Sequence, residues 1–131
     1  LYKADAEAVI HEAKPLFLNF NNIYLPPDQK TLVLKKFLFN TLVNIFMLTS
    51  HTHKYGELFQ IQIHGGKRDG ELVYTSTAWN HPEIKTYDPP ISLAANEGLI
   101  MIITYNNTSS RPVRFGLTSE DEMAIIYGFY Y

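Results

Sequence analysis

Cysteine is absent from this 131-residue chain, which excludes a disulfide framework, a thiolate zinc site and a cysteine nucleophile. Long apolar runs are missing too. The most hydrophobic stretch, 37–47, contains Asn40, Thr41 and Asn44, so we expect no membrane span. Charge of one sign is not in excess, because 11 Lys and Arg residues are scattered among 13 Asp and Glu residues. We therefore expect no nucleic-acid partner.

The residues that are present favour a packed core. Hydrophobic residues make up 46% and aromatic residues 14% of the chain, which is too apolar for a disordered segment. The length is typical of one domain, so we expect a single domain over 1–131, with 1–15 forming an arm or a first strand. Because the chain opens at Leu1 rather than Met, we expect it to be part of a longer protein.

Short runs rich in β-branched and aromatic residues predict strands. Clusters of Pro, Gly and Asn separate these runs, and we interpret 65–70 as a hairpin tip and Pro89-Pro90 as a turn. The segment 59–63 alternates apolar residues with glutamine, as a half-buried strand does. No long helical pattern is present, so the sequence predicts an all-β, two-sheet antiparallel sandwich. The predicted strands are 31–39, 42–53, 58–63, 72–76, 99–105 and 123–131.

The most distinctive local motif is His51-Thr52-His53, at the end of a predicted strand. Residues i and i+2 of a strand project from one face with Cα atoms about 6.5 to 7 Å apart, so both imidazoles can reach one metal ion. Two surface histidines at a strand end would show the same spacing, and a third ligand is needed to favour a metal. The remaining histidines, His11, His64 and His81, are too dispersed to be assigned to it.

Met123 is a possible third ligand, although methionine side chains most often fill gaps in a core. Two imidazoles and a thioether form a soft donor set that suits Cu(I), whereas zinc prefers a thiolate or carboxylate in third place. A metal held by these residues should therefore be copper. The acidic run Glu120-Asp121-Glu122 just before Met123 is interpreted as a solvated loop.

Three segments together resemble a known family: 48–56, which contains the two histidines, 118–123, which ends at Met123, and the ending 127–131. They look like the C-terminal domain of the ascorbate-dependent type II copper monooxygenases, a family that includes peptidylglycine alpha-hydroxylating and dopamine beta-monooxygenase, and most like its bacterial members. The resemblance implies a jelly-roll-like sandwich of about eight to nine strands and an extracytoplasmic location. It also implies one copper ion, cycling between Cu(I) and Cu(II), held by His51, His53 and Met123, with ascorbate as the reductant.

The resemblance also indicates a substrate site. Tyr127 corresponds to a tyrosine that borders the substrate in the peptide enzyme, where an arginine and an asparagine stand in place of Thr49 and Ile125. Without that arginine, a peptide carboxylate is not an expected substrate. Hydroxylation in this family uses two coppers on two domains, so we expect a second copper or electron-transfer domain as a partner.

Three functions are open at this point. The chain can be the oxygen-activating half of a copper monooxygenase that hydroxylates a C–H bond of a small molecule. It can instead be a non-catalytic copper carrier or sensor module built on the same sandwich. A third alternative is an interaction module without metal, with Tyr55, Trp79 and the Tyr130-Tyr131 end as an aromatic contact surface.

Overall fold

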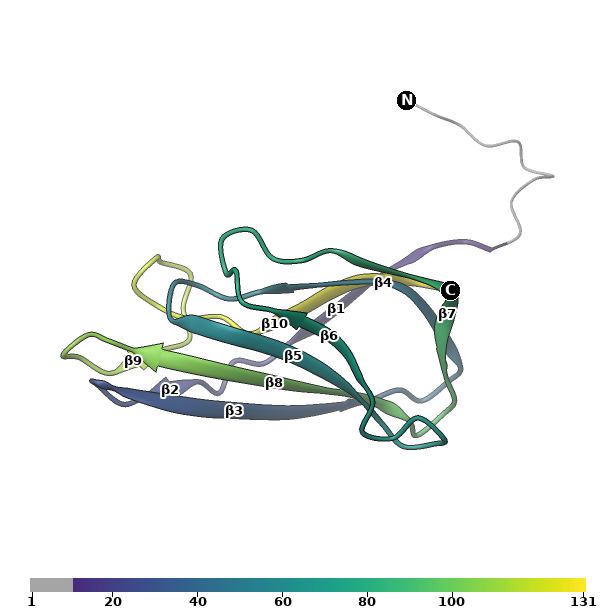
Figure 1. The fold of residues 1–131 in the computed structure, drawn as a ribbon, viewed down its shortest axis with the longest axis horizontal. Helices are drawn as coiled ribbons and strands as arrows, with labels where there is room; N and C mark the ends of the chain where they lie inside the picture. The colour runs from purple at the N-terminus through teal and green to yellow at the C-terminus, as the bar shows by residue number, and fades with distance from the viewer. Residues whose placement is uncertain (1–10) are drawn as a thin grey trace, which may run out of the picture.

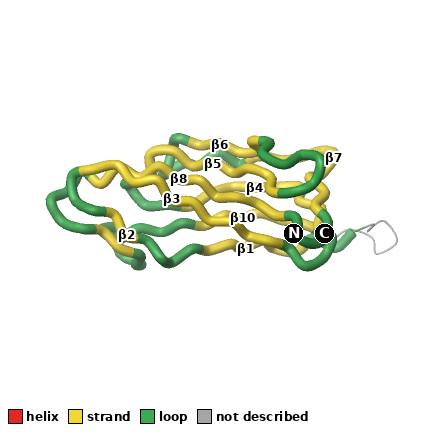
Figure 2. The backbone as a smooth tube through the Cα atoms, turned by 90° about the horizontal axis from the view of Figure 1, so that it is seen from below, coloured by secondary structure: helices red, strands yellow, loops and turns green. Residues whose placement is uncertain are grey.

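The computed structural model describes residues 11–131, in which every regular element is a β-strand (Figure 2). The all-β prediction is confirmed. None of these residues belongs to a helix of the length and apolarity that crossing a membrane requires. The strands are β1 (Lys14–Asn19), β2 (Tyr24–Leu25), β3 (Gln29–Leu38), β4 (Val43–His51), β5 (Gly56–His64), β6 (Leu72–Ser76), β7 (Lys85–Leu93), β8 (Gly98–Asn107), β9 (Val113–Arg114) and β10 (Ile125–Tyr130).

Two four-stranded antiparallel sheets form the layers of the sandwich (Figure 1). One sheet has the order β1-β10-β4-β7 and the other the order β3-β8-β5-β6. The pairing is nested along the chain, because β1 pairs with β10, β3 with β8, β4 with β7 and β5 with β6. This nesting of eight strands defines a jelly roll. The strand total rises to ten because β2 and β9, of two residues each, form a separate small ladder.

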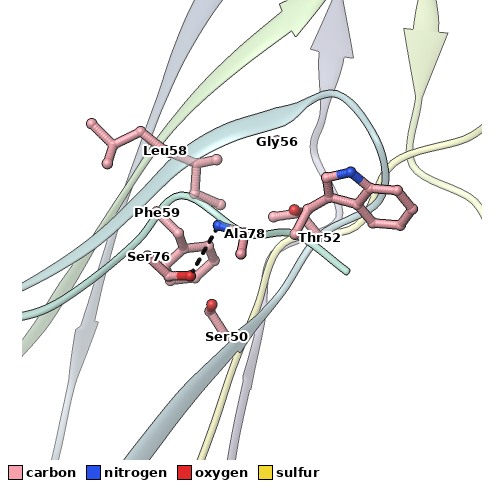
Figure 3. Close-up of a pocket in the computed structure, with 9 residues that line it drawn as sticks. Ser50, Thr52, Gly56, Leu58, Phe59, Ser76 and Ala78 are labelled. Carbon is pink, nitrogen blue, oxygen red and sulfur yellow. Dashed lines mark hydrogen bonds between the residues drawn. The ribbon is translucent and has the colours of Figure 1, made fainter. Parts of the chain in front are cut away.

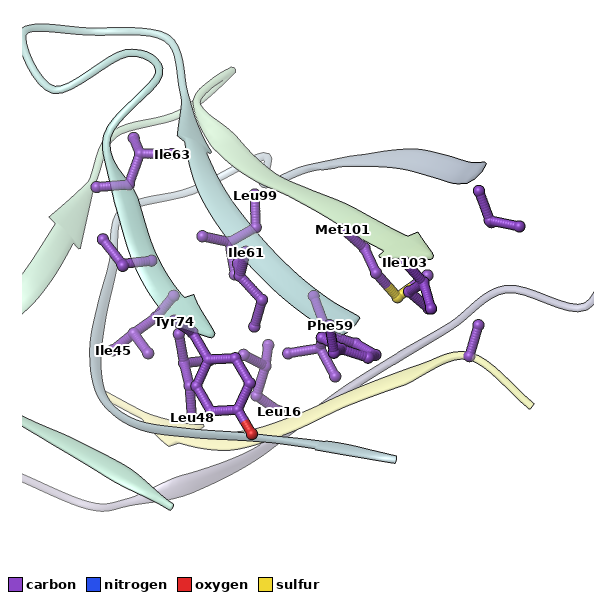
Figure 4. Packing of buried hydrophobic residues seen from close by; sticks show 14 of the residues in the cluster. Leu16, Ile45, Leu48, Phe59, Ile61, Ile63, Tyr74, Leu99, Met101 and Ile103 are labelled. Atoms are coloured by element: carbon purple, nitrogen blue, oxygen red, sulfur yellow. The ribbon is translucent and has the colours of Figure 1, made fainter. Parts of the chain in front are cut away.

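The core lies between the two sheets and follows the period-two pattern of the strands (Figure 4). In β5, Phe59, Ile61 and Ile63 are buried, while the glutamines between them are only partly covered. In β8, Met101 and Ile103 are fully buried in the same way. Each such side chain contributes about 1.5–3 kcal/mol through removal from water. Alternation in the sequence therefore decides which face of each strand is internal.

Pro89-Pro90 does not form a turn but lies within β7, which is an edge strand of its sheet. Proline is tolerated there because an edge strand does not need every backbone N–H for pairing. The hairpin tip at 65–70 is confirmed, since it joins β5 to β6. The expected arm at 1–15 falls largely on residues outside the described part of the chain, and β1 begins at Lys14.

The register of β4 against β10 positions the residues of interest at one end of the sandwich. These two strands are neighbours in the sheet, with His51 opposite Ile125 and Thr49 opposite Tyr127. His51 is the last residue of β4, and Ile125 is the first residue of β10. The turn between β4 and β5 and the loop before β10, coloured yellow in Figure 1, consequently lie at the same end.

Candidate metal centre

The imidazoles of His51 and His53 face one another beyond the end of β4. Their ring centroids are 5.3 Å apart and their planes are nearly perpendicular, at 84°. Thr52 between them is buried, so the two histidines share the opposite, more open side. With metal–nitrogen bonds of about 2.0 Å, two imidazoles on one ion have centroids roughly 5 to 6 Å apart. The observed ring spacing therefore fits a shared metal ion.

Both rings can supply a neutral nitrogen, the form that binds metals. The Nδ1 atom of His53 lies 2.9 Å from the carbonyl oxygen of Asp121. Because a carbonyl only accepts, Nδ1 must carry a proton, so the neutral tautomer of this ring keeps its lone pair on Nε2. Burial, and then the nearby charge of His53, lower the pKa of His51. Both effects favour the neutral form of the His51 ring.

Glu122 connects the histidine turn to the Met123 segment. Its side chain is fully buried and accepts backbone N–H bonds from His53 at 2.7 Å, Tyr55 at 2.8 Å and Met123 at 3.2 Å. One oxygen, Oε1, accepts both the His53 and the Met123 bonds, so these two backbone nitrogens are no further apart than the sum of those distances. Burial raises the pKa of Glu122, and the three N–H donors offset part of that effect. The interpretation of the acidic run 120–122 as a solvated loop is wrong for Glu122, because its side chain is fully buried and its oxygens accept backbone N–H bonds instead of binding water.

Further hydrogen bonds fix the backbone around Met123. The buried Tyr105 hydroxyl donates to the Met123 carbonyl at 2.5 Å. The Glu122 backbone pairs with the end of β9 and the residues that follow it, donating to the carbonyl of Arg114 and accepting from the N–H of Gly116. Met123 lies two residues before β10 begins, and its side chain is partly exposed. The fold thus fixes the main chain of the predicted third ligand beside that of His53.

The donor set decides which metal fits this place. Within residues 11–131, no group of three or more His, Cys, Asp and Glu side chains is placed to hold a metal ion. The third ligand predicted for a site built on His51 and His53 is the sulfur of Met123, whose backbone shares the Glu122 carboxylate with that of His53. Two imidazoles and a thioether suit Cu(I), so the residues present fit copper.

The other three histidines have different neighbours. The ring of His11 stacks on that of Tyr131, with centroids 4.0 Å apart. His64, at the end of β5, has Nδ1 3.8 Å from Asp69. His81 is exposed in the loop between β6 and β7.

The three residues predicted to face a substrate differ in how accessible they are. Tyr127 is 39% exposed, and its ring centroid lies 6.4 Å from that of His51. Ile125 is almost fully buried, and the Thr49 hydroxyl donates to the carbonyl of Glu83 at 2.8 Å. Of these positions, Tyr127 offers the most surface to a bound molecule.

The loop 77–84 between β6 and β7 carries Trp79 to the same end of the sandwich. Its two ends are fixed, because the Ser76 hydroxyl accepts the N–H groups of Ala78 and Glu83. Figure 3 shows the bond to Ala78. The Tyr74 hydroxyl also donates to the Glu83 carbonyl at 2.7 Å. A cavity of about 10 Å³ behind this loop is no larger than one water needs, so it is too small for an organic ligand. Tyr55 is buried rather than part of an aromatic contact surface.

Replacing Tyr74 with phenylalanine should loosen the Trp79 loop. The buried hydroxyl bonds both Ser50 and the Glu83 carbonyl, so its loss should cost about 1–3 kcal/mol of unfolding free energy. We expect faster amide exchange over 77–84 and stronger acrylamide quenching of Trp79, measured beside Tyr24→Phe, whose ring is 47% exposed, as the matched control. Equal quenching in the two variants would show that Tyr74 does not anchor the loop.

One family model matches nearly the whole chain. Residues 18–131 match the family model described as copper type II ascorbate-dependent monooxygenase, C-terminal domain. A search of curated proteins finds no match. Among solved structures, the chain is similar to one titled "Structure of infectious bursal disease virus Gx strain", at 11% identity and a TM-score of 0.27. That alignment covers 99% of this chain and 35% of the other, and a likeness at this level carries no argument.

Proposed function

Because this chain belongs to the copper type II ascorbate-dependent monooxygenases, as their C-terminal domain, we propose that it binds one copper ion through His51, His53 and Met123. The observation that carries the proposal is the buried carboxylate of Glu122, which joins the backbone of His53 to that of Met123. The paired imidazoles, 5.3 Å apart, add a spacing suited to one ion. Copper bound there would supply a binding place for dioxygen and a one-electron couple.

The proposed reaction is hydroxylation of a small organic molecule. One atom of dioxygen enters a C–H bond and the other leaves as water, with two protons and two electrons supplied, the electrons coming from ascorbate. Tyr127 would border the substrate, since its exposed ring lies beside His51. Thr49 and Ile125 would flank it without providing a charge.

A further domain is part of this proposal. One copper supplies one electron, whereas hydroxylation consumes two, so a second copper or an electron-transfer domain must deliver the other. The description of the matched family as a C-terminal domain supports this arrangement. A copper carrier or sensor would need only the site described above.

An anaerobic Cu(I) titration of the chain, with a chromophoric chelator as competitor, tests the copper site. We expect one tight equivalent, and X-ray absorption should detect sulfur as well as nitrogen around the metal. Absence of a tight equivalent would overturn the proposal.

Ascorbate and dioxygen consumption by the copper-loaded chain then separates the two roles. Consumption coupled to a hydroxylated product, once an electron donor is present, supports the monooxygenase. Tight binding without any product under those conditions favours the carrier.

A further inference from the structure

An apolar recess lies directly beside His53. It has a volume of about 280 Å³ and is lined by His53, Lys54, Trp79, Leu117 and Ser119. An apolar cavity of about 150 Å³ is enough to hold benzene, so this recess can accept one aromatic ring with a short substituent. Its position next to a proposed copper ligand distinguishes it from the other hollows of the surface.

The two large hydrophobic side chains of the recess are unusually open to water. Trp79 is 44% exposed and Leu117 is 83% exposed. They come from different loops, 77–84 and 115–124, that meet at the end of the sandwich. Covering an exposed leucine and the face of an indole with an apolar group would gain free energy in proportion to the area removed from water.

Both loops are held in place by hydrogen bonds. The Ser76 hydroxyl fixes the ends of the Trp79 loop, as described above. In the Leu117 loop, the Asp121 carboxylate accepts bonds from the N–H and the hydroxyl of Thr118, the residue after Leu117. A recess with fixed walls loses less entropy on binding than one that must be ordered.

The charges around the recess are already paired. Lys54 contacts the Glu120 carboxylate at 2.9 Å, and Arg111 lies 3.6 Å from the same carboxylate and donates to the Glu120 carbonyl. The Asp121 carboxylate accepts a hydrogen bond from the Thr118 hydroxyl, and the Glu122 carboxylate is buried among three backbone N–H donors. A ligand with a charge of either sign would therefore compete with an existing contact. An uncharged ligand would not.

We propose that this recess binds an uncharged aryl or similarly compact apolar group of the substrate, with Trp79 and Leu117 as specificity-determining residues. This inference rests on the proposed function, because the recess is assigned to the substrate through its contact with His53. It names the substrate class: neutral molecules with an aromatic or apolar end, rather than peptide carboxylates.

The test uses the metal-free 131-residue chain and two probes that share one ring, phenylacetamide and phenylacetate. Binding is followed at pH 7 by amide and indole N–H shifts in NMR spectra and by emission of Trp79, the single tryptophan. We expect phenylacetamide to shift Trp79 and Leu117 with a dissociation constant on the order of 1 mM. Phenylacetate should bind at least about tenfold more weakly, which corresponds to about 1.4 kcal/mol.

Variants assign the binding to this recess. Trp79→Ala and Leu117→Asp should each weaken phenylacetamide binding by about tenfold or more, again about 1.4 kcal/mol. Leu42→Asp is the matched control, since Leu42 is also an exposed loop leucine but lies at the other end of β4. At about 3.3 Å per residue along that strand, Leu42 is roughly 30 Å from His51. Shifts that map elsewhere, or equal binding by all variants, would overturn the proposal.

A second measurement separates this inference from the copper proposal. Cu(II) added to the chain should broaden the aryl proton signals of phenylacetamide, and His51→Ala and His53→Ala should remove the broadening. Failure of Cu(II) and Cu(I) to bind, with phenylacetamide still in the recess, would refute the copper function and leave the recess as an aryl-binding site with no assigned reaction. Copper binding with no aryl binding would refute the substrate inference alone.

Discussion

Met123→Leu should weaken Cu(I) binding by at least about 100-fold, because loss of a direct ligand should exceed the 10–100-fold cost of losing an outer partner. Leucine nearly matches methionine in volume but has no sulfur, so packing changes little while the proposed third donor is lost. The measurement is competition against a chromophoric Cu(I) chelator under anaerobic conditions. X-ray absorption of the variant should show nitrogen without sulfur around any copper that remains.

His51→Ala and His53→Ala should have effects at least as large, since each removes one of two imidazoles on the same ion. Matched controls come from the chain itself: Met47→Leu changes a methionine in the middle of β4, and His64→Ala changes a histidine at the end of β5. Both controls should keep the full affinity. Equal affinity in Met123→Leu, His51→Ala and the controls would place the copper, if any binds, elsewhere on the protein.

Glu122→Ala should lower the free energy of unfolding by about 3 kcal/mol or more, because each buried N–H left without an acceptor costs about 1–3 kcal/mol. Three such groups, on His53, Tyr55 and Met123, lose their acceptor at once. Urea denaturation followed by far-UV circular dichroism measures the loss. Glu120→Ala is the neighbouring control, and it should change stability little because Glu120 is exposed.

Glu122→Gln separates positioning from stability. The amide keeps one accepting oxygen in the same volume but turns an NH₂ group toward one of the backbone donors. We expect a folded protein, intermediate in stability, whose Cu(I) affinity is about 10- to 100-fold lower, the usual cost of losing an outer partner of a metal ligand. Unchanged copper affinity in a folded Glu122→Gln protein would mean that Glu122 supports the fold without positioning His53 and Met123.

Much of the fold could be predicted from local patterns. Alternation in 59–63 reports which side of a strand faces the core, and the structure buries Phe59, Ile61 and Ile63 as that pattern requires. Turn residues at 65–70 mark a hairpin for an equally local reason. Pro89-Pro90 misled the prediction, because whether proline ends a strand or lies in it depends on whether that strand is an edge.

The candidate site, too, could be predicted from the sequence only in part. The spacing of His51 and His53 alone predicts that two imidazoles project together, since it needs only the geometry of one strand. The pairing of these histidines with Met123 could not be predicted from a local spacing, because some 70 residues separate His53 from Met123. That prediction came from the resemblance of whole segments to a known family. Neither Glu122 nor Trp79 carried a local signal for a place beside the histidines: a glutamate in an acidic run is usually solvated, and Trp79 was assigned only to a possible aromatic contact surface.

Only the tertiary structure decided what those two residues do. The jelly roll brings the β4–β5 turn, the β6–β7 loop and the segment before β10 to one end of the sandwich. There the buried carboxylate of Glu122 accepts backbone N–H bonds from His53 and Tyr55 in the distant β4–β5 turn and from its own neighbour Met123, and Trp79 lies beside His53. By itself the sequence predicted the strands β3, β4, β5, β6, β8 and β10, the inward face of segments such as 59–63 and the paired imidazoles, because these depend on neighbours along the chain. The burial of Glu122 and the contact of Trp79 with the histidine turn depend on how distant strands pair, so they could be read only from the assembled sheets.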